Sequence, residues 1–229
     1  MLPPAMPTRI SIVIPVLNEA SRIVATLTAL APLRAQGAEL IVVDGGSSDD
    51  TAALCKGLAD AVLSAPRGRA LQMNAAARAA SGAVLLFLHA DTRLPDDALT
   101  QIAQAVQTQP WGRFDVRIAG RSPILPVVAA LMNTRSRLTG IATGDQALFV
   151  RRDAFDAVGG FPAQPLMEDI ELCKRLRRLG QPACLRAKVV TSGRRWDSRG
   201  AWRTIGLMWR LRLLYWLGVP AGRLAAAYR

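Results

Sequence analysis

The chain has 229 residues, of which 51% are hydrophobic and 20% charged, so it is too apolar for a disordered protein and long enough for one folded domain. Lys and Arg (29) outnumber Asp and Glu (17), and the excess lies in residues 171–229, which hold 14 basic and two acidic side chains. Three cysteines without a C-x-x-C pair exclude a disulfide framework and a zinc ribbon.

The first half of the sequence alternates apolar strands with helices. Residues 10–16 are mostly β-branched and apolar, which is typical of a strand buried on both faces of a parallel sheet. The elements predicted in chain order are a strand at 10–16, a helix at 22–35, a strand at 40–43, a helix at 50–59, a strand at 61–63, a helix at 69–80 and a strand at 83–88. This order, with short connections, predicts a parallel sheet with right-handed crossovers and helices on both faces.

Polar side chains follow three of the four predicted strands: Asn18 and Glu19, then Asp44, then His89 and Asp91. Because ligands bind outside the carboxyl ends of such strands, a shared site is predicted there. Each residue taken alone also fits a helix cap or a turn. The motifs G-x-x-x-x-G-K-[ST] and G-x-G-x-x-G are absent, which excludes a P-loop protein and argues against a dinucleotide cofactor.

From residue 111 the alternation is less regular. The apolar segment 124–132 is too short to span a bilayer and predicts a buried helix rather than a re-entrant membrane segment. Residues 168–179 predict a helix whose acidic start and basic end suit the helix dipole.

The C-terminal segment 201–229 is predicted to form a basic, Trp-rich amphipathic helix. Trp202, Trp209 and Trp216 are seven residues apart, so a helix places the three indoles on one stripe. Indoles beside arginines suit a helix that lies in the headgroup region of an anionic leaflet. The stripe fits equally well a helix that packs on its own domain or on a second subunit. Residues 1–8 are expected to be a short N-terminal tail.

Four motifs, taken together and in this order, resemble the family 2 glycosyltransferases of GT-A fold. The motifs are SIVIPVLNE at 11–19, IVVDGGSSDDT at 41–51, LLFLHADT at 85–92 and MEDIE at 167–171. The resemblance covers residues 9–200, and the short chain is similar to the small stand-alone bacterial members of the family. It implies an α/β domain with a Rossmann-like, mostly parallel sheet, divided into a nucleotide-sugar-binding half (9–110) and an acceptor-binding half (111–200).

The resemblance also implies roles for single residues on the donor side. Pro15, Asn18 and Glu19 would line the pocket for the base and ribose, and Asp44 would accept hydrogen bonds from the base. Asp91 matches the last carboxylate of the family's D-x-D motif. It would bind the Mg²⁺ or Mn²⁺ that bridges the two phosphates of the donor.

On the acceptor side the resemblance points to the pair Glu168 and Asp169. Asp169 matches the general base that deprotonates the acceptor hydroxyl, a poor nucleophile that needs a carboxylate within hydrogen-bond reach. Residues 144–150 are similar to the strand that precedes the catalytic helix of the family. In that segment Asp145 would contact the acceptor or the sugar, or would only make a turn.

His89, the only histidine of the chain, stands where the family usually has the first Asp of D-x-D. Three alternatives stay open. His89 would contact the ribose or a phosphate, would join Asp91 as a metal ligand and so favour Mn²⁺, or would be a buried residue with satisfied hydrogen bonds.

Three arginines and a tryptophan are further candidates. Arg69, at the start of the third predicted helix, would meet the diphosphate or would be a solvated loop residue. Arg194, Arg195 and Trp196 resemble the family's Q-x-x-R-W element without its Gln. They imply an arginine clamp on the diphosphate and an indole against the sugar or the acceptor.

The resemblance therefore implies an inverting glycosyltransferase that uses a nucleotide sugar, with UDP or GDP as the nucleotide, and we expect a lipid-linked or small-molecule acceptor. It is expected in the cytoplasm, either free or on the inner face of the membrane. The alternatives are a sugar nucleotidyltransferase and a non-enzymatic membrane- or nucleic-acid-binding protein. Nucleic acid is not expected as a partner, because no nucleic-acid-binding motif accompanies the basic residues.

Overall fold

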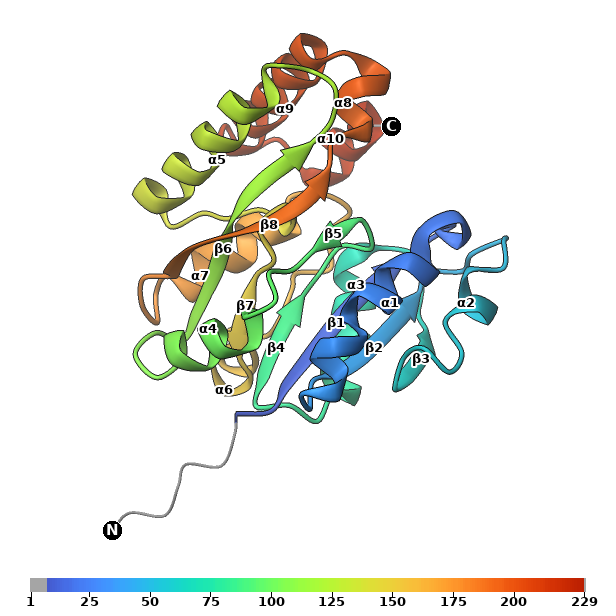
Figure 1. The fold of residues 1–229 in the computed structure, drawn as a ribbon. Coiled ribbons are helices and arrows are strands. Elements are labelled where there is room, and N and C mark those ends of the chain that lie inside the picture. Colours follow the sequence, from blue (N-terminus) through green and yellow to red (C-terminus); the bar gives the residue numbers. More distant parts are fainter. Residues whose placement is uncertain (1–7, 229) are drawn as a thin grey trace.

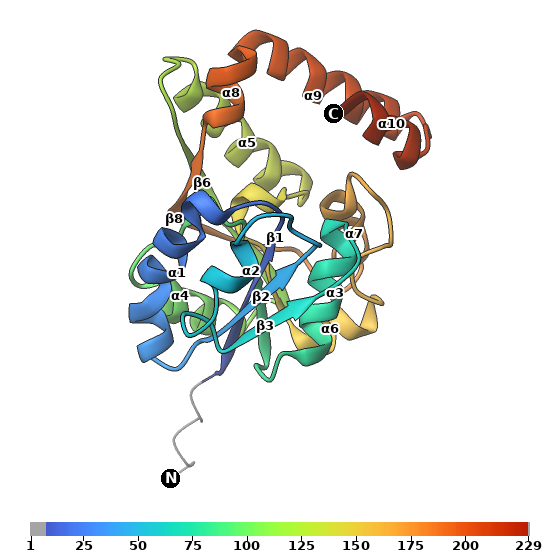
Figure 2. The ribbon, with the colours of Figure 1, turned by 90° about the vertical axis from the view of Figure 1, so that its right-hand side faces the viewer.

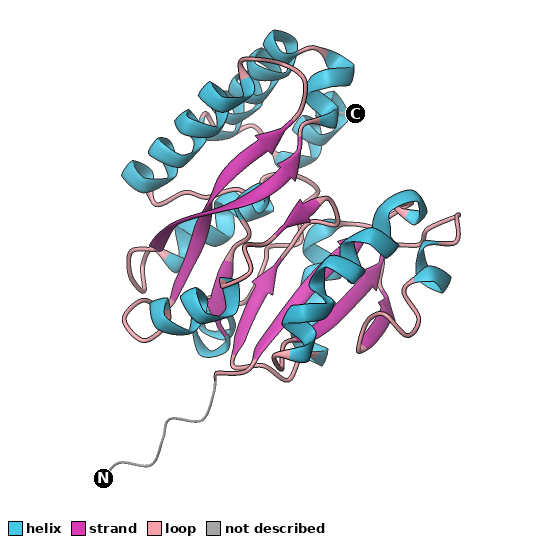
Figure 3. Ribbon diagram, in the orientation of Figure 1, coloured by secondary structure: helices cyan, strands magenta, loops and turns pink. Residues whose placement is uncertain are grey.

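The computed structural model describes residues 8–228, except for the side chains of Arg195, Arg199 and Tyr228. Nearly all of the predicted N-terminal tail, and residue 229, therefore lie outside the described residues. An eight-stranded sheet runs through the described chain in the order β3-β2-β1-β4-β7-β6-β8-β5 (Figures 1 and 3). Most of its strand pairs are parallel, as predicted.

The first half folds as predicted into parallel strands connected by helices. Strand β1 pairs with β2 and β4, and β2 pairs with β3. The side chains of β1 alternate between two apolar cores, with Ile12 and Ile14 on one face and Val13 on the other, so the strand is buried on both faces. The elements are β1 Ile10–Val16, α1 Ala20–Ala35, β2 Glu39–Asp44, α2 Thr51–Leu54, β3 Ala61–Ser64, α3 Arg69–Ala79 and β4 Val84–Phe87.

Helix α2 is much shorter than the helix predicted at 50–59. It ends at Leu54, and the chain then turns through residues 55–58. Gly57 has a φ of 80°, the left-handed conformation that stops a helix and that glycine adopts without steric cost.

The second half adds antiparallel pairs to the sheet. Strand β7 is antiparallel to both β4 and β6, whereas β6 and β8 run parallel over most of their length. The elements are β5 Thr92–Arg93, α4 Ala98–Ala105, β6 Trp111–Ala119, α5 Leu125–Thr139, η1 Gly144–Gln146, β7 Phe149–Arg151, α6 Arg152–Ala157, α7 Glu168–Leu176 and β8 Ala183–Ser192.

The predicted elements of this half are present with altered bounds. The apolar segment at 124–132 is part of helix α5, which buries Leu125 and Val128 and exposes Val127. The segment 144–150 forms a strand only from Phe149, because residues 144–146 make a 3₁₀ turn that carries Asp145 toward the cavity described below. Helix α7 ends three residues early, where its last turn tightens into bonds between residues three apart.

The C-terminal segment forms helices that lie beyond the carboxyl ends of the parallel strands (Figure 2). The bounds are α8 Arg194–Arg199, α9 Ala201–Trp216 and α10 Ala221–Tyr228. The single helix predicted for 201–229 is therefore divided, because Gly218 has a φ of 88° and Pro220 cannot continue a helix. No helix among the described residues is long and apolar enough to cross a bilayer.

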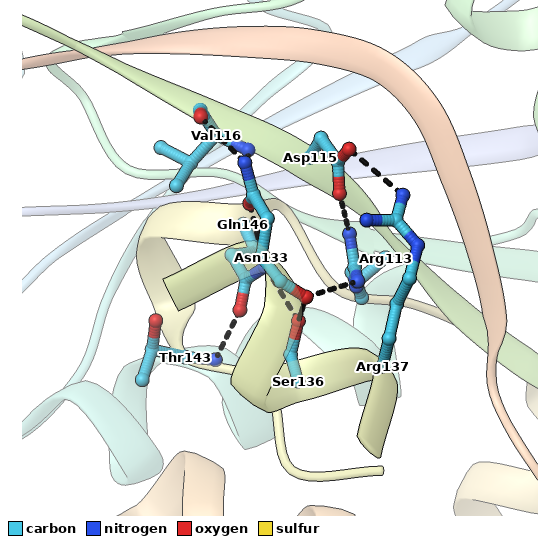
Figure 4. Close-up of polar contacts among 8 residues, drawn as sticks. All are labelled: Arg113, Asp115, Val116, Asn133, Ser136, Arg137, Thr143 and Gln146. Carbon is cyan, nitrogen blue, oxygen red and sulfur yellow. Dashed lines mark hydrogen bonds and ion pairs between the residues drawn. The ribbon is translucent and has the colours of Figure 1, made fainter. Parts of the chain in front are cut away.

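A buried polar network joins β6, α5 and η1 (Figure 4). The Asn133 amide donates to the carbonyl of Val116 (3.0 Å) and accepts from its N–H (2.9 Å), as a neighbouring strand would. The Gln146 amide donates to Asn133 Oδ1 (3.3 Å) and to Ser136 Oγ (3.0 Å). Nearby, buried Arg113 is paired with Asp115. The network attaches the 3₁₀ turn, which contains Asp145, to helix α5.

Replacing Asn133 with Ala should lower the free energy of unfolding by about 2–4 kcal/mol, because two buried backbone groups of β6 lose their partners. For a chain of this size the melting temperature should fall by roughly 5–15 °C. Calorimetry of the variant checks the value, with Thr134→Ala, at an exposed position one residue along α5, as the control. Equal stability of the two variants would contradict the role of the network.

Candidate functional site

A cavity of about 480 Å³, here called the larger cavity, lies at the carboxyl ends of β1 and β4. Its wall combines residues from both halves of the sheet with residues from α8 and α9. Eight of the residues singled out in the sequence line it: Pro15, Glu19, Arg69, His89, Asp91, Asp145, Arg194 and Trp196. The strand-end residues predicted to share a site are therefore largely brought together by the fold.

Two predicted donor-side residues, Asn18 and Asp44, are not in this wall. Asn18 has a φ of 54°, and its side-chain oxygen accepts the N–H of Ser48 at 2.8 Å. The carboxylate of Asp44 is buried and accepts the N–H groups of Gly46 (3.1 Å) and Ser47 (3.0 Å). Both side chains hold the loops that follow β1 and β2, and a contact with a base stays a prediction for them.

Glu19 and Asp91 place two carboxylates in the wall of the larger cavity. Burial raises the pKa of Glu19, the charge of Arg22 opposes this, and the nearby charge of Asp91 adds to the rise. Arg22 Nη1 lies 2.9 Å from Glu19 Oε2. The cavity is thus acidic next to these two side chains, whereas Arg67 and Arg69 contribute positive charge elsewhere in its wall.

The carboxylates in the cavity wall can be tested for their fit to the divalent cation that the fold implies. Among the described residues, no three His, Cys, Asp or Glu side chains are arranged to hold a metal ion by themselves. Mg²⁺ and Mn²⁺ prefer oxygen ligands, and Mg²⁺ commonly binds through one or two carboxylates together with waters and substrate phosphates. The carboxylate of Asp91 in the cavity wall fits a cation bound in this way, together with a diphosphate.

His89 is held between the first two residues of the 3₁₀ turn. Its Nδ1 lies 3.3 Å from Asp145 Oδ1, and a Cβ on Gly144 would collide with its Nε2. Burial raises the pKa of Asp145, but the hydrogen bond and charge of His89 and the charge of Arg69 bring it below its ordinary value. His89 therefore has a carboxylate partner on one nitrogen, and ligation of a metal by His89 stays a prediction.

Glu168 and Asp169 begin α7 beside a second cavity of about 110 Å³, here called the smaller cavity. Asp169 Oδ2 accepts the N–H of Gly144 at 3.0 Å. Burial and the charge of Asp169 raise the pKa of Glu168, which is almost inaccessible. Arg69, His89, Asp145 and Met208 line both cavities. The predicted base therefore lies next to the predicted donor site.

Helices α8 and α9 close the site from the other side. Arg194 and Trp196 line the larger cavity as predicted, whereas the side chain of Arg195 lies outside the described residues. Sequence reasoning missed Gly144, although a glycine directly before Asp145 was a usable signal. It also missed Arg212, which α9 places in the wall of the smaller cavity. Arg212 belongs to no sequence motif, so the sequence offered no signal for it.

Comparisons with known proteins show which family and which folds the chain is similar to. Residues 11–158 match the family model described as glycosyl transferase family 2. No curated protein matches the chain in sequence.

Among solved structures, residues 1–349 of TarS from S. aureus in complex with UDP-GlcNAc have a TM-score of 0.65 at 18% identity, covering 80% of this chain and 58% of that one. The mannosyltransferase PcManGT from Pyrobaculum calidifontis, with GDP-Man and Mn²⁺, has a TM-score of 0.64 at 23% identity, covering 91% and 61%. Glucosyl-3-phosphoglycerate synthase from Mycobacterium tuberculosis, with Mn²⁺, UDP and glucosyl-3-phosphoglycerate, has a TM-score of 0.62 at 24% identity, covering 93% and 81%. The chain thus spans about three fifths of the length of the TarS 1–349 and PcManGT chains, and these likenesses show a shared fold.

Proposed function

Because the chain belongs to glycosyl transferase family 2, we propose that it transfers a sugar from a UDP- or GDP-linked donor to an acceptor hydroxyl, with inversion at the anomeric carbon. The observation that carries the proposal is the larger cavity, whose wall combines carboxylates and arginines at the strand ends and adjoins Asp169. The nucleotides bound in TarS, PcManGT and the mycobacterial synthase support this choice of donor.

In this proposal the donor occupies the larger cavity. Pro15 and Glu19 contact the base and ribose, Arg69 and Arg194 contact the diphosphate, and Trp196 lies against the sugar. Asp91 would hold Mg²⁺ or Mn²⁺, which would supply charge neutralisation of the departing diphosphate. His89 keeps Asp145 oriented toward the same cavity through their 3.3 Å contact.

The residues around the smaller cavity handle the acceptor. Asp169 accepts the proton of the acceptor hydroxyl, and the resulting oxygen attacks the anomeric carbon from the side opposite the diphosphate. The bond to the diphosphate breaks as the new glycosidic bond forms, so one displacement inverts the configuration. The N–H of Gly144, 3.0 Å from Asp169 Oδ2, fixes the direction of the carboxylate.

A nucleotide-sugar screen tests the proposed function. In the presence of Mn²⁺ or Mg²⁺, one UDP- or GDP-sugar should raise the melting temperature by mass action and should be hydrolysed slowly without acceptor. The nucleoside diphosphate is the expected product. Release of pyrophosphate from a nucleoside triphosphate and a sugar phosphate would instead reveal a sugar nucleotidyltransferase.

The outer face of α9 suits an anionic membrane surface. Trp202, Trp209 and Trp216 are 76%, 69% and 78% exposed, so the described fold does not cover the indole stripe. Arg203 and Arg210, both exposed, flank the stripe on the same helix. We propose that this face lies in the headgroup region of the cytoplasmic leaflet, where indoles and arginines are both stabilised.

Replacing the three tryptophans with Ala should weaken binding to vesicles that contain anionic lipid by at least about tenfold, since each indole loses apolar contact with the interface. Vesicle flotation measures the change, and Leu138→Ala, which truncates an 82% exposed residue on α5, is the matched control. Undiminished flotation of the triple variant would contradict the membrane proposal. If sedimentation showed loss of a dimer instead, the stripe would be a subunit interface.

A further inference from the structure

Helix α9 also has an inner face, and this face brings a cation to the predicted base. Arg212 lines the smaller cavity together with Glu168 and Asp169, and it does not line the larger one. Burial lowers the pKa of Arg212, while the charges of Asp169 and Asp145 oppose the shift. None of the ion pairs found among the described residues includes Arg212, so both carboxylates act on it without direct contact.

A second arginine stands behind the first. Arg135 comes from α5, and its Nε and Nη2 atoms are buried without a hydrogen-bond partner among the described residues. Burial and the charge of Arg212 lower the pKa of Arg135 to about 10, although the charge of Asp169 opposes the shift. Two guanidinium groups that repel each other in a partly buried place are costly unless an anion compensates them.

We propose that Arg212, with Arg135 behind it, binds an oxyanion carried by the acceptor, a phosphate or a carboxylate, and so brings the acceptor hydroxyl to Asp169. This inference rests on the proposed function and adds the chemical class of the acceptor. A guanidinium matches such a group because it offers two parallel N–H donors in one plane. The arginine therefore acts on substrate binding rather than on the displacement itself.

The position of Arg212 assigns the anion to the acceptor rather than to the donor. Asp91 and Arg194, which are proposed to hold the metal and the diphosphate, line the larger cavity only, whereas Arg69, the other proposed contact of the diphosphate, lines both cavities. Arg212 and Asp169 line the smaller cavity only, and its 110 Å³ has room for a small group such as a phosphate but not for a nucleotide. An anion at Arg212 would thus lie beside the base, in a cavity that shares Arg69 but neither Asp91 nor Arg194 with the proposed donor site.

The test compares Arg212→Gln with Arg210→Gln, a control on the same helix at an exposed position. Inorganic phosphate at about ten times its dissociation constant should raise the melting temperature of the wild type and the control by roughly 3–6 °C. Arg212→Gln should lose this shift, and Arg212→Lys should keep part of it. The stabilisation by UDP with Mg²⁺ should be the same in all four proteins.

The thermal shifts by phosphate and by UDP distinguish failure of the anion site from failure of the proposed function. No phosphate shift in the wild type, or an equal shift in Arg212→Gln, overturns the anion site, while stabilisation by UDP leaves the proposed function intact. Loss of both shifts in Arg212→Gln and Arg212→Lys assigns Arg212 to the donor site and overturns the acceptor assignment.

Two arms then distinguish the source of the anion. One offers soluble glycerol phosphate as acceptor and the other offers phosphatidic acid in phosphatidylcholine vesicles. The site is supported if labelled sugar is transferred to either acceptor and Arg212→Gln lowers kcat/KM at least tenfold by raising KM. Transfer that the substitution leaves unchanged contradicts it.

Discussion

Replacing Asp169 with Asn should lower kcat by about 10²–10⁴-fold, because the acceptor hydroxyl then has no base to accept its proton. Binding of the donor should not change, since Asp169 lies in the smaller cavity and outside the wall of the larger one. The amide oxygen of Asn can still accept the N–H of Gly144, so the fold of the turn should be preserved. Initial rates over a range of acceptor concentrations, combined with the thermal shift by donor, measure both quantities.

The control for this prediction is Asp156→Asn, which makes the same chemical change at an exposed position on α6. It should leave kcat within about twofold. If Asp169→Asn turned over as fast as the control, Asp169 would not be the base. Glu168, which is buried and has a raised pKa, would be the next carboxylate to replace.

The strands of the first half could be predicted because their signal is local. A run such as Ile10–Val16 is apolar except for Ser11, and a strand buried on both faces accommodates this in a short segment. Where a single residue decides the end of a helix, the apolar pattern was not enough to predict the bounds. Gly57 ended α2 early and Gly218 divided the C-terminal helix, and neither glycine interrupts the apolar pattern strongly.

The candidate site was predictable at the strand ends but not where tertiary contacts create it. His89 and Asp91 follow a strand, so topology alone places them on the rim of the sheet. The contact of His89 with Gly144 and Asp145 depends on how the 3₁₀ turn is tied to α5. No spacing in the sequence encodes that distance.

The positive charge of residues 171–229 divides into two parts in the fold. Arg203 and Arg210 point to solvent on α9, where they flank the indole stripe. Arg212, two residues after Arg210, turns inward to the smaller cavity. A helix rotates by 200° over two residues, which explains how Arg210 reaches solvent while Arg212 reaches the smaller cavity. Net charge alone therefore could not separate membrane contact from substrate binding.

Replacing Asp91 with Asn should lower kcat/KM by about 10²–10³-fold and should abolish the metal-dependent part of donor binding. Asp91 lines the larger cavity, and the described residues there form no metal cage that could replace its carboxylate. The loss corresponds to several kcal/mol of charge stabilisation at the departing diphosphate. Titration of UDP with and without Mn²⁺ should show a stabilisation that depends on Mn²⁺ in the wild type and not in the variant.

The matched control is Asp96→Asn, an exposed Asp five residues further along the chain and beyond β5, which should bind UDP and Mn²⁺ as the wild type does. The variant His89→Gln separates the open alternatives for the histidine. If His89 is a metal ligand, this change should weaken Mn²⁺ binding more than Mg²⁺ binding, because imidazole prefers the softer ion. If His89 only orients Asp145, the binding of both metals should be affected equally.

The Asp91 prediction would be contradicted if the Asp91→Asn variant depended on Mn²⁺ as strongly as the wild type does. Another group would then hold the metal, and Glu19, the neighbouring carboxylate in the cavity wall, would be replaced next.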